Sequence, residues 1–360
     1  MKRIILTGGG TAGHATPNIA LLPSLLDLNY DIHYIGSYDG IERKLIEDMN
    51  VPYYGISSGK LRRYFDIKNF TDPFKILKGC GQARKLLKQL KPDIVFSKGG
   101  FVSVPVVITS KMFHIPVIIH ESDMTPGLAN KLSIPSAEKV CCNFPETLTL
   151  LPSEKAVLTG SPIRQELLSG NRVEALNICG FTANKPVILV IGGSQGSVII
   201  NDAIRSILPE LLKTFQVIHL CGQGKLDTSL SHLEGYVQFE YVKKELADFF
   251  ALADICISRA GANAICELLA LQKPNLLIPL SAAASRGDQI LNAESFKNQG
   301  FSEVLHEDEL AYTFLLPMIQ KLYNNKNQYI SAMEKSSQGN AISKIIDLIE
   351  ETTQTQKTKH

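Results

Sequence analysis

Residues 254–292 read DICISRAGANAICELLALQKPNLLIPLSAAASRGDQILN, which predicts a strand, a tight loop, a helix and a second strand. Asp254–Ser258 and Asn275–Pro279 are short apolar runs bounded by Gly or Pro, as is typical of buried strands. Asn263–Leu271 lies between them and has the alanine and leucine content of a helix. The three elements together predict a βαβ unit.

The loop before this helix is suited to binding a phosphate. Gly261 and the alanines beside it place nothing bulky over the first N–H groups of the helix, where the positive end of the helix dipole lies. Glu267 is about one turn further on, where its carboxylate could accept from a ribose diol. Asp288, Gln289 and Asn292 follow and suit sugar hydroxyls. The alternative is an ordinary βαβ unit with a small packing loop and a solvated glutamate.

The composition is that of a globular protein of about two domains, since the chain has 360 residues and a domain has roughly 150. Its 44% hydrophobic content allows substantial cores. The seven cysteines form no C-x-x-C pair, so we expect reduced thiols in a cytoplasmic protein. We expect no signal peptide, because Ile4–Leu6 is too short, and no apolar run reaches the ~18 residues of a membrane span.

The charge is distributed unevenly along the chain. Residues 1–160 hold 19 Lys and Arg against 14 Asp and Glu, whereas residues 161–360 hold 18 against 21. A basic first half and an acidic second half are consistent with two domains that face different partners. Nucleic acid is not expected among them, because no long basic arm or known binding motif accompanies the charge.

A glycine loop also opens the chain. Arg3–Leu6 predicts a buried strand that leads into GGGTAGH (8–14), and a helix is expected from about Pro17 to Leu28. The loop ends in His14, which lies near the helix start and is therefore a candidate for a chemical role.

The glycine spacing of this loop fits the G-x-G-x-x-G pattern of dinucleotide sites. However, the next strand, Asp31–Ile35, ends in Gly36-Ser37, and Asp39 comes too late to bind the ribose of NAD. We therefore expect no nicotinamide cofactor.

Lys60–Lys91 combines basic and aromatic residues. It carries ten Lys and Arg against two Asp, with Tyr64, Phe65, Phe70 and Phe74 interleaved. Such a mixture on a loop and helix predicts a surface for an anionic membrane. The alternative is a solvated helix whose apolar stripe packs on its own domain, which explains the leucines but does not require the aromatics.

Further loops follow predicted strands of the first half. SKGGF (97–101) follows Asp93–Phe96, and HESD (120–123) ends Pro116–His120. Ligands collect at the carboxyl ends of strands in open α/β sheets, so Glu121 and Asp123 are placed for acid–base chemistry, unless they are inert loop carboxylates. The remaining strands expected here are Val140–Cys142 and Ala156–Thr159.

The pattern restarts after a linker, Gly160–Arg164. Val187–Ile191 predicts a strand, GGSQGS (192–197) a glycine loop and Val198–Leu212 a helix, followed by strands at Val217–Leu220 and Val237–Glu240. The chain is therefore predicted to be α/β, with two similar nucleotide-fold halves. No Asp-x-Asp pair for a divalent ion occurs, so we expect no metal and no other cofactor, and a leaving phosphate would be stabilised by glycine loops, helix starts and one arginine.

The chain resembles the MurG-type family over nearly its whole length. The resemblance rests on the motifs GGGTAGH, SKGGF, HES, TGSPIR, GGSQGS, SRAGANAICE (258–267) and GDQILNA (287–293) taken together. Members of this family are UDP-N-acetylglucosamine (UDP-GlcNAc) transferases of peptidoglycan synthesis, and so contribute to cell shape and division. The resemblance implies a GT-B fold with two Rossmann-like domains. Residues 1–160 would form a domain facing the acceptor and the membrane, joined by a C-terminal helix at about 341–360, and residues 161–340 would bind UDP-GlcNAc.

The resemblance also implies the site residues. The donor would be bound by Glu267 at the ribose, by Ser194, Ala262, Asn263, Ala264, Ile265 and Cys266 at the diphosphate, by Val242 at the uracil, by Gln289 at GlcNAc, and by Arg164. Thr11, Ala12 and Gly13 would close on the donor or on the acceptor diphosphate. Two positions depart from the family pattern: Ala12 replaces a glycine, and Asp123 stands where the family more often has asparagine.

The implied reaction is inverting and independent of metal. The C4 hydroxyl of undecaprenyl-diphospho-muramoyl-pentapeptide would attack the anomeric carbon as UDP leaves, at the cytoplasmic face of the cell membrane. His14 is the leading base, because a helix start lowers the pKa of an imidazole and keeps it neutral, and Glu121 is its rival. The alternative functions are a diacylglycerol glucosyltransferase, a UDP-GlcNAc 2-epimerase of the same fold, and a non-enzymatic sensor of nucleotide sugars.

Overall fold

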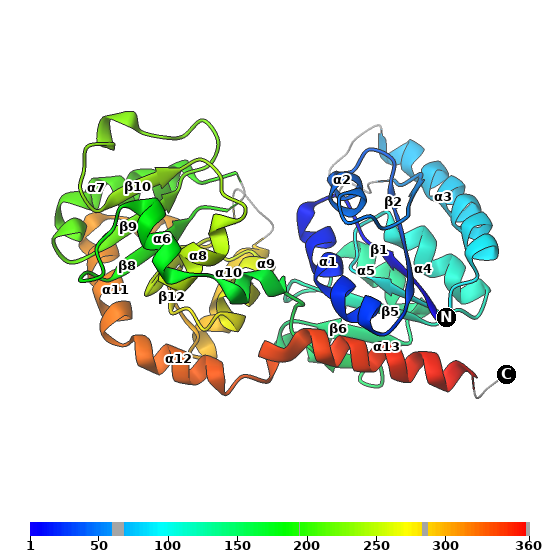
Figure 1. The fold of residues 1–360 in the computed structure, drawn as a ribbon. Helices are drawn as coiled ribbons and strands as arrows, with labels where there is room; N and C mark the ends of the chain where they lie inside the picture. The colour runs from blue at the N-terminus through cyan, green and yellow to red at the C-terminus, as the bar shows by residue number, and fades with distance from the viewer. Residues whose placement is uncertain (60–67, 194, 283–286, 358–360) are drawn as a thin grey trace. The chain divides into compact units, whose positions relative to one another are not determined.

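The computed structural model describes residues 1–59, 68–193, 195–282 and 287–357, and side chains are described for all of these except 68–73, 337, 356 and 357. The chain forms two compact units (Figure 1). Unit 1 comprises Met1–Arg164 and Asn340–His360, and unit 2 comprises Gln165–Gly339.

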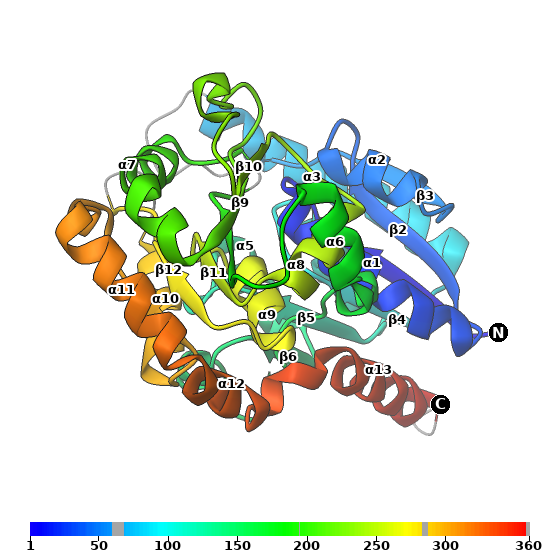
Figure 2. The ribbon, with the colours of Figure 1, turned by 60° about the vertical axis from the view of Figure 1, so that its left-hand side comes forward.

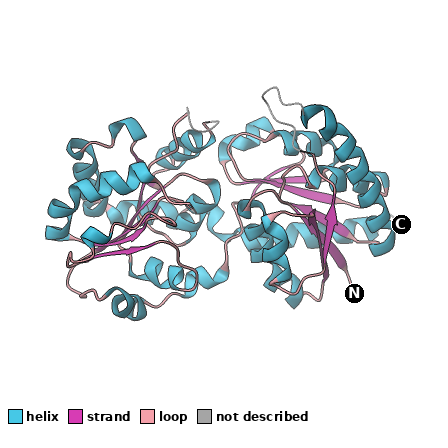
Figure 3. Ribbon diagram, turned by 90° about the horizontal axis from the view of Figure 1, so that it is seen from above, coloured by secondary structure: helices cyan, strands magenta, loops and turns pink. Residues whose placement is uncertain are grey.

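Unit 1 is built on a parallel sheet of seven strands among its described residues, in the order β3-β2-β1-β4-β5-β6-β7. The strands are β1 (Arg3–Thr7), β2 (Asp31–Ser37), β3 (Tyr53–Ile56), β4 (Ile94–Ser97), β5 (Val117–Glu121), β6 (Lys139–Cys142) and β7 (Ala156–Leu158). Ile4, Ile5 and Leu6 of β1 are all fully buried, because helices cover both faces of the sheet. Figure 3 shows the helices on either side of the strands.

The helices of unit 1 pack on this sheet through two apolar clusters. They are α1 (Ala12–Asp27), α2 (Ile41–Glu47), α3 (Lys68–Leu90), α4 (Ser103–Met112), α5 (Leu128–Ser133) and α13 (Ala341–Lys357). On one face, Ile4 and Leu6 pack with α1 and α13. On the other face, Ile5 packs with α3 and α4. Successive residues of β1 therefore serve opposite faces, as the pleat requires.

Helix α13 belongs to unit 1 although it follows unit 2 in the sequence. Ile345 and Ile349 are fully buried in the same cluster as Ile4. At the rim, Glu350 accepts from Lys2 Nζ and from the Tyr30 hydroxyl, both at 2.5 Å. The last helix is thus part of the unit 1 core (Figure 1, red).

Unit 2 has a parallel sheet of six strands among its described residues, in the order β10-β9-β8-β11-β12-β13. Its strands are β8 (Val187–Ile191), β9 (Gln216–Leu220), β10 (Tyr236–Phe239), β11 (Ile255–Ser258), β12 (Asn275–Leu277) and β13 (Ser302–Val304). Its helices are α6 (Arg172–Cys179), α7 (Val198–Thr214), α8 (Glu245–Leu252), α9 (Ala262–Ala270), α10 (Asp288–Asn298), α11 (Tyr312–Asn324) and α12 (Lys326–Glu334). One apolar cluster joins Ile188 and Ile257 of the sheet to Ile204 of α7 and Ile319 of α11.

In each sheet the strand order reverses beside the first strand. In unit 1 the reversal lies between β1 and β4, and in unit 2 between β8 and β11. Ligands of open α/β sheets bind at the carboxyl ends of the strands on either side of such a reversal. The loops after β1, β4, β8 and β11 are therefore the places to look for a site.

The predicted strands are confirmed, and the differences are local. The first helix begins at Ala12, not near Pro17, and Pro17 lies inside it, where it costs one backbone hydrogen bond but does not end the helix. His14 is consequently in the first helical turn. Strands β3 and β13 were not predicted, because both are short and partly polar.

Candidate active site

Two glycine loops meet at the carboxyl edge of the unit 1 sheet. One follows β1 and the other follows β4. A Cβ added to Gly100, whose φ of +84° already suits glycine, would lie 2.2 Å from the carbonyl oxygen of Gly9. Only glycine at residue 100 therefore allows the two loops to touch, and their backbones form one continuous surface.

His14 lies beside this surface, partly buried in the first turn of α1. Its Nδ1 is 3.1 Å from the Thr11 hydroxyl. Burial and then the nearby Lys98 cation lower the pKa of His14 to about 4, although the Gly9 backbone and the Glu42 carboxylate act in the opposite direction. The imidazole is therefore neutral at pH 7 and has one unprotonated nitrogen with which to accept a proton.

Glu121 is fixed by hydrogen bonds and is almost fully buried. Its Oε1 accepts from the backbone N–H groups of Ser122 at 2.8 Å and Asp123 at 3.1 Å. Its Oε2 accepts from Gly127 N at 2.9 Å and from Asn130 Nδ2 at 2.8 Å. Burial raises the pKa of this carboxyl, but both oxygens already hold the loop after β5. The two predicted bases therefore differ in their surroundings: the imidazole of His14 is neutral, and the carboxylate of Glu121 holds the loop that follows it.

A buried lysine lies between these two residues and was missed in the sequence. Lys98 Nζ is 2.6 Å from His120 Nδ1 and donates to Ser122 Oγ at 2.7 Å. His120 Nε2 is 2.8 Å from the carbonyl oxygen of Gly160, four residues before Arg164. The SKGGF and HES motifs are therefore linked to the start of the GSPIR segment. A lysine directly after one apolar strand and a histidine near the end of the next were the signal in the sequence for this contact.

In unit 2, Arg259 joins the loops that follow β8, β11 and β12. This arginine is almost fully buried, and its guanidinium donates to Ser197 Oγ at 2.7 Å and to the Ile278 carbonyl at 3.1 Å. It also pairs with Glu307 at 2.5 Å, while Glu307 accepts from Ser281 N at 3.0 Å. Although burial opposes ionisation, Arg259 holds the pKa of Glu307 below its usual range. A charged residue directly after an apolar strand was the available signal for Arg259.

The start of α9 lies beside these loops (Figure 2, yellow). Gly261 precedes the helix with a φ of −67° and has no side chain to cap the first turn. A Cβ added to Gly261 would meet no described atom within 4 Å. Among the described residues, nothing therefore crowds Gly261 at the helix start, and Glu267 lies in the second turn of the helix, partly exposed. Such an N-terminus can accept an anion.

The predicted site residues fall into two groups, one in each unit. Thr11 and Ala12 are exposed, and Gly13 and Arg164 are partly buried, in unit 1. In unit 2, Val242 follows β10, and Gln289 of α10 accepts from Leu280 N at 3.1 Å, which ties its side chain to the loop after β12. Ser194 lies outside the described residues. Ala262, Asn263, Ala264, Ile265 and Cys266 form the first turns of α9.

Two parallel-sheet α/β units with glycine loops at the carboxyl ends of their first strands form a GT-B fold, as predicted. The chain matches the glycosyltransferase family 28 N-terminal domain over residues 4–142 and the family 28 C-terminal domain over residues 187–349. It belongs to glycosyltransferase family 28, and its resemblance to the MurG-type members is confirmed by the relatives that follow.

The chain is 66% identical over 351 residues to a UDP-N-acetylglucosamine--N-acetylmuramyl-(pentapeptide) pyrophosphoryl-undecaprenol N-acetylglucosamine transferase of Lachnoclostridium phytofermentans, covering 98% of this chain and 99% of that protein. A Clostridium tetani protein of the same name is 60% identical, with 97% and 98% covered. Among solved structures, the chain is similar to Acinetobacter baumannii MurG, with a TM-score of 0.75, 26% identity and coverage of 98% and 100%.

The fold is also shared with proteins of much lower sequence identity. A putative UDP-N-acetylglucosamine 2-epimerase from Listeria monocytogenes matches with a TM-score of 0.69 at 12% identity, covering 97% of this chain and 96% of that one. The fold by itself therefore does not separate a transferase from an epimerase.

Proposed function

We propose that this chain transfers GlcNAc from UDP-GlcNAc to the C4 hydroxyl of undecaprenyl-diphospho-muramoyl-pentapeptide, with inversion and without a metal ion. The observation that carries the proposal is the identity of 58–66% with transferases of that name over 97–98% of the chain. The neutral imidazole of His14 and the open helix start at Gly261 support it, since the reaction requires a base and a site for the leaving diphosphate.

In the proposed reaction, His14 takes the proton of the C4 hydroxyl while that oxygen forms a bond to the anomeric carbon. The bond from that carbon to the diphosphate oxygen breaks, and UDP carries the electron pair away. Glu121 does not touch the reacting atoms but holds the 122–127 loop. Because the free enzyme keeps the pKa of His14 at about 4, we infer that the anionic acceptor raises it on binding and so strengthens the base.

The donor would be bound by unit 2. The proposed contacts are the first turn of α9 and Ser194 to the diphosphate, Glu267 to the ribose, the backbone of Val242 to uracil, and Gln289 to GlcNAc. Arg259 would not contact the donor, because its guanidinium is occupied by Ser197, Ile278 and Glu307. It would instead keep the loops around the donor in place. Arg164, Thr11, Ala12 and Gly13 remain proposed contacts from unit 1.

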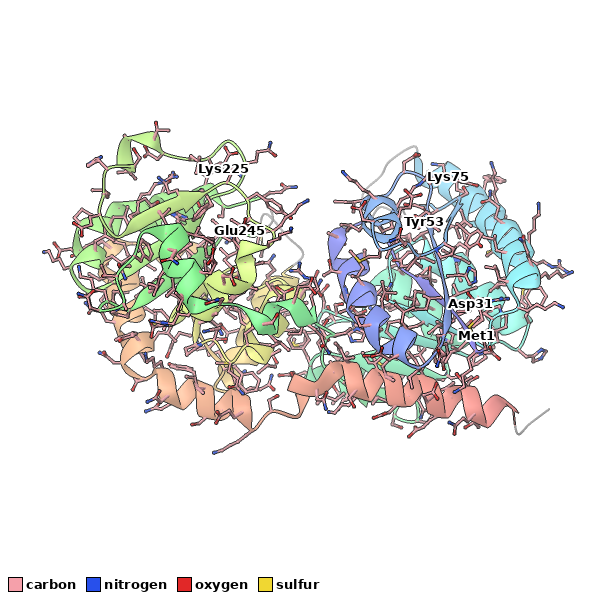
Figure 4. All side chains as sticks on the ribbon, in the orientation of Figure 1. Met1, Asp31, Tyr53, Lys75, Lys225 and Glu245 are labelled. Carbon is pink, nitrogen blue, oxygen red and sulfur yellow. The ribbon has the colours of Figure 1, made fainter. Side chains whose placement is uncertain are left out.

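The acceptor carries a polyprenyl chain, so the enzyme would dock as a peripheral protein on the cytoplasmic face of the membrane, through unit 1. Phe74 and Leu77 of α3 are 73% and 68% exposed, and Lys75 and Lys78 beside them are exposed as well. Figure 4 labels Lys75 near the start of the described part of this helix. Tyr64, Phe65, Arg62 and Arg63 lie outside the described residues. No described helix is long and apolar enough to span a bilayer.

One turnover assay tests the proposed function. UDP-GlcNAc is supplied with a polyprenyl-diphospho-muramoyl-pentapeptide, with diacylglycerol, or with no acceptor, and UDP-glucose is supplied with diacylglycerol in a further arm. Each arm is run with and without excess chelator. We expect a disaccharide only with the muramoyl acceptor, at a rate that the chelator leaves nearly unchanged. Glucosylated or GlcNAc-bearing diacylglycerol, or ManNAc formed without an acceptor, would assign the chain to one of the alternative activities. UDP-GlcNAc binding with no product in any arm would indicate a sensor.

A further inference from the structure

Two buried side chains of opposite charge lie on the two sides of the glycine loop that precedes His14. Glu42 comes from α2 and is fully buried, and Lys98 comes from the loop after β4 and is 1% exposed. Charged side chains are rarely buried to this extent unless a specific contact holds them. The contacts of both residues lead to the same loop.

Glu42 holds the loop from one side. Its Oε2 accepts from the backbone N–H of Gly10 at 3.2 Å, and its Oε1 accepts from the backbone N–H of Ser37 at 3.0 Å. The Ser37 hydroxyl donates to the same oxygen. A Cβ added to Gly9 would lie 2.3 Å from Glu42 Oε1, so the carboxylate is packed directly against the loop backbone.

Lys98 lies against the other side. A Cβ added to Gly8 would be 3.3 Å from Lys98 Cβ and 3.1 Å from the carbonyl oxygen of His14. The ammonium has only donors, so His120 Nδ1 must accept from it. His120 Nε2 then carries the proton that it donates to the Gly160 carbonyl. Burial and the Lys98 cation together hold the pKa of His120 well below its ordinary value, so this imidazole stays neutral.

We propose that Glu42 and Lys98 are a pair of positioning residues for His14, which fix the glycine loop from opposite sides and surround the imidazole with opposing charges. The role of His14 as the base rests on the proposed function, but the action of the pair on the imidazole does not. Burial and Lys98 together keep His14 free of a proton before the acceptor arrives. Glu42 stabilises the imidazolium that forms when His14 takes the hydroxyl proton.

The electrostatic effects of the two residues are expected to be separable. The charged groups acting on the imidazole are Lys98 from the loop after β4 and Glu42 from α2, and the Gly9 backbone adds a hydrogen bond. Thr11 contributes a neutral hydroxyl. Lys98 lowers the pKa of His14 and Glu42 raises it, so neutralising each one should shift the pKa in opposite directions. A pair that acted only through packing would produce no such opposition of sign.

The test is an NMR titration of the full-length protein labelled with ¹⁵N-histidine, with the His14 signals assigned from a His14→Gln variant. We expect the wild-type pKa of His14 near 4. In Lys98→Met it should rise by on the order of one unit, and adding Glu42→Gln to that variant should lower it again by a smaller amount, because Glu42 acts less strongly on the imidazole than Lys98. Measuring Glu42→Gln in the Lys98→Met background keeps the titration above the pH at which acid unfolds the protein.

Matched controls are Lys111→Met on α4 and Glu47→Gln on α2, since both residues are exposed. Each control should leave the pKa of His14 unchanged. An unchanged pKa in Lys98→Met, or shifts of the same sign on removing either charge, would overturn the inference. If Lys98→Met does not fold, Lys98→Gln replaces it in both variants, and a His14 pKa that stays or falls in Lys98→Gln would overturn the inference. The titration uses no substrate, so its outcome is separate from that of the turnover assay.

Discussion

His14 lies in the first turn of α1, after the glycine loop that follows β1, and Glu121 lies at the end of β5. Their surroundings suit the two side chains to different tasks. The imidazole is neutral and lies beside a backbone surface formed by two glycine loops. The carboxylate is saturated by four donors from its own loop and from Asn130. Because these four donors occupy both oxygens of Glu121, we propose His14 as the base, with the bound anionic acceptor raising its pKa from about 4.

We therefore expect His14→Ala to lower kcat by ~10²–10⁴-fold, the range for losing a general base, with the affinity for UDP-GlcNAc largely kept. Steady-state kinetics and calorimetry measure the two effects. Glu121→Gln is the companion variant. The NH2 group of the glutamine would face N–H groups that donate to the carboxylate in the wild type, and this repulsion should loosen the 122–127 loop. The substitution should raise KM for the acceptor more than it lowers kcat. A collapse of kcat in Glu121→Gln beside a small loss in His14→Ala would transfer the role of base to Glu121.

The ribose contact is a second prediction for a single residue. Glu267 lies one turn behind the open start of α9, so Glu267→Ala should weaken UDP and UDP-GlcNAc binding equally, by about 1.5–3 kcal/mol. Calorimetry with each ligand measures the loss. Glu210→Ala, a change at a partly exposed residue of α7 in the same unit, is the control and should bind both ligands like the wild type. Wild-type affinity in Glu267→Ala would remove this residue from the ribose.

Among the elements, α3 bears the proposed membrane contact. Lys75 and Lys78 flank the exposed Phe74 and Leu77, so Lys75→Ser with Lys78→Ser should weaken binding to anionic vesicles by about 2 kcal/mol, at ~1 kcal/mol for each basic residue near the surface. Phe74→Ser with Leu77→Ser should remove the part of the binding that high salt does not screen. Vesicle flotation at low and high salt measures both effects.

The control for this prediction removes two basic residues elsewhere in unit 1, through Lys44→Ser with Lys111→Ser. Both pairs of lysine variants should still glycosylate a soluble short-chain acceptor, because neither changes the proposed site. If the variant lacking Lys75 and Lys78 floats as well as the wild type, the described part of α3 is an ordinary solvated helix.

The strands could be predicted from the sequence wherever they are buried on both faces, because such strands are continuous apolar runs. The predicted Val187–Ile191 matches β8 residue for residue. Strand β13 (Ser302–Val304) has only three residues, two of them polar, and carries no such signal. The start of α1 was placed too late because proline is most common in the first turn of a helix, whereas Pro17 lies inside this one.

The polar framework of the site could not be predicted in the same way. The loops themselves were recognisable from their glycines, but the contacts beneath them join distant positions. Arg259 pairs with Glu307, and Glu42 reaches Gly10, only because neighbouring strands bring their loops together. Periodicity and local composition carry no information about such pairs.

At the scale of the whole molecule, buried histidines connect stability to pH. In unit 2, His219 is fully buried between the Tyr236 hydroxyl at 2.9 Å and Asn201 Oδ1 at 3.0 Å. Burial and then Arg205 lower its pKa to about 3. Because the unfolded state takes up a proton below about pH 6.5 and the folded state does not, stability should fall as the pH drops from 6.5 towards 3.

Protonation of this histidine in the unfolded state should by itself lower the free energy of unfolding by about 2 kcal/mol between pH 7 and pH 5. His219→Gln should be less stable than the wild type at pH 7. Between pH 7 and pH 5, however, its free energy of unfolding should decrease by about 2 kcal/mol less than that of the wild type. Urea unfolding at the two pH values, followed by far-UV circular dichroism, measures the difference. His232→Gln, an exposed change in the same unit, should keep the wild-type dependence. An identical pH dependence in His219→Gln and wild type would contradict the assignment.

The chain leaves unit 1 at Arg164 and returns to it at Asn340, so the stability of unit 1 depends on a helix that follows unit 2 in the sequence. Ile349 of α13 is fully buried in the cluster that contains Ile4 and Leu21. Ile349→Ala should therefore lower the unfolding free energy of unit 1 by about 2–5 kcal/mol, whereas the exposed Glu351→Ala should change it by less than about 0.5 kcal/mol. Calorimetry should find UDP binding nearly unchanged in both variants, because most of the proposed contacts to UDP lie in unit 2. Loss of UDP affinity in Ile349→Ala, with unit 1 unfolding as in the wild type, would mean that the helix supports unit 2 instead.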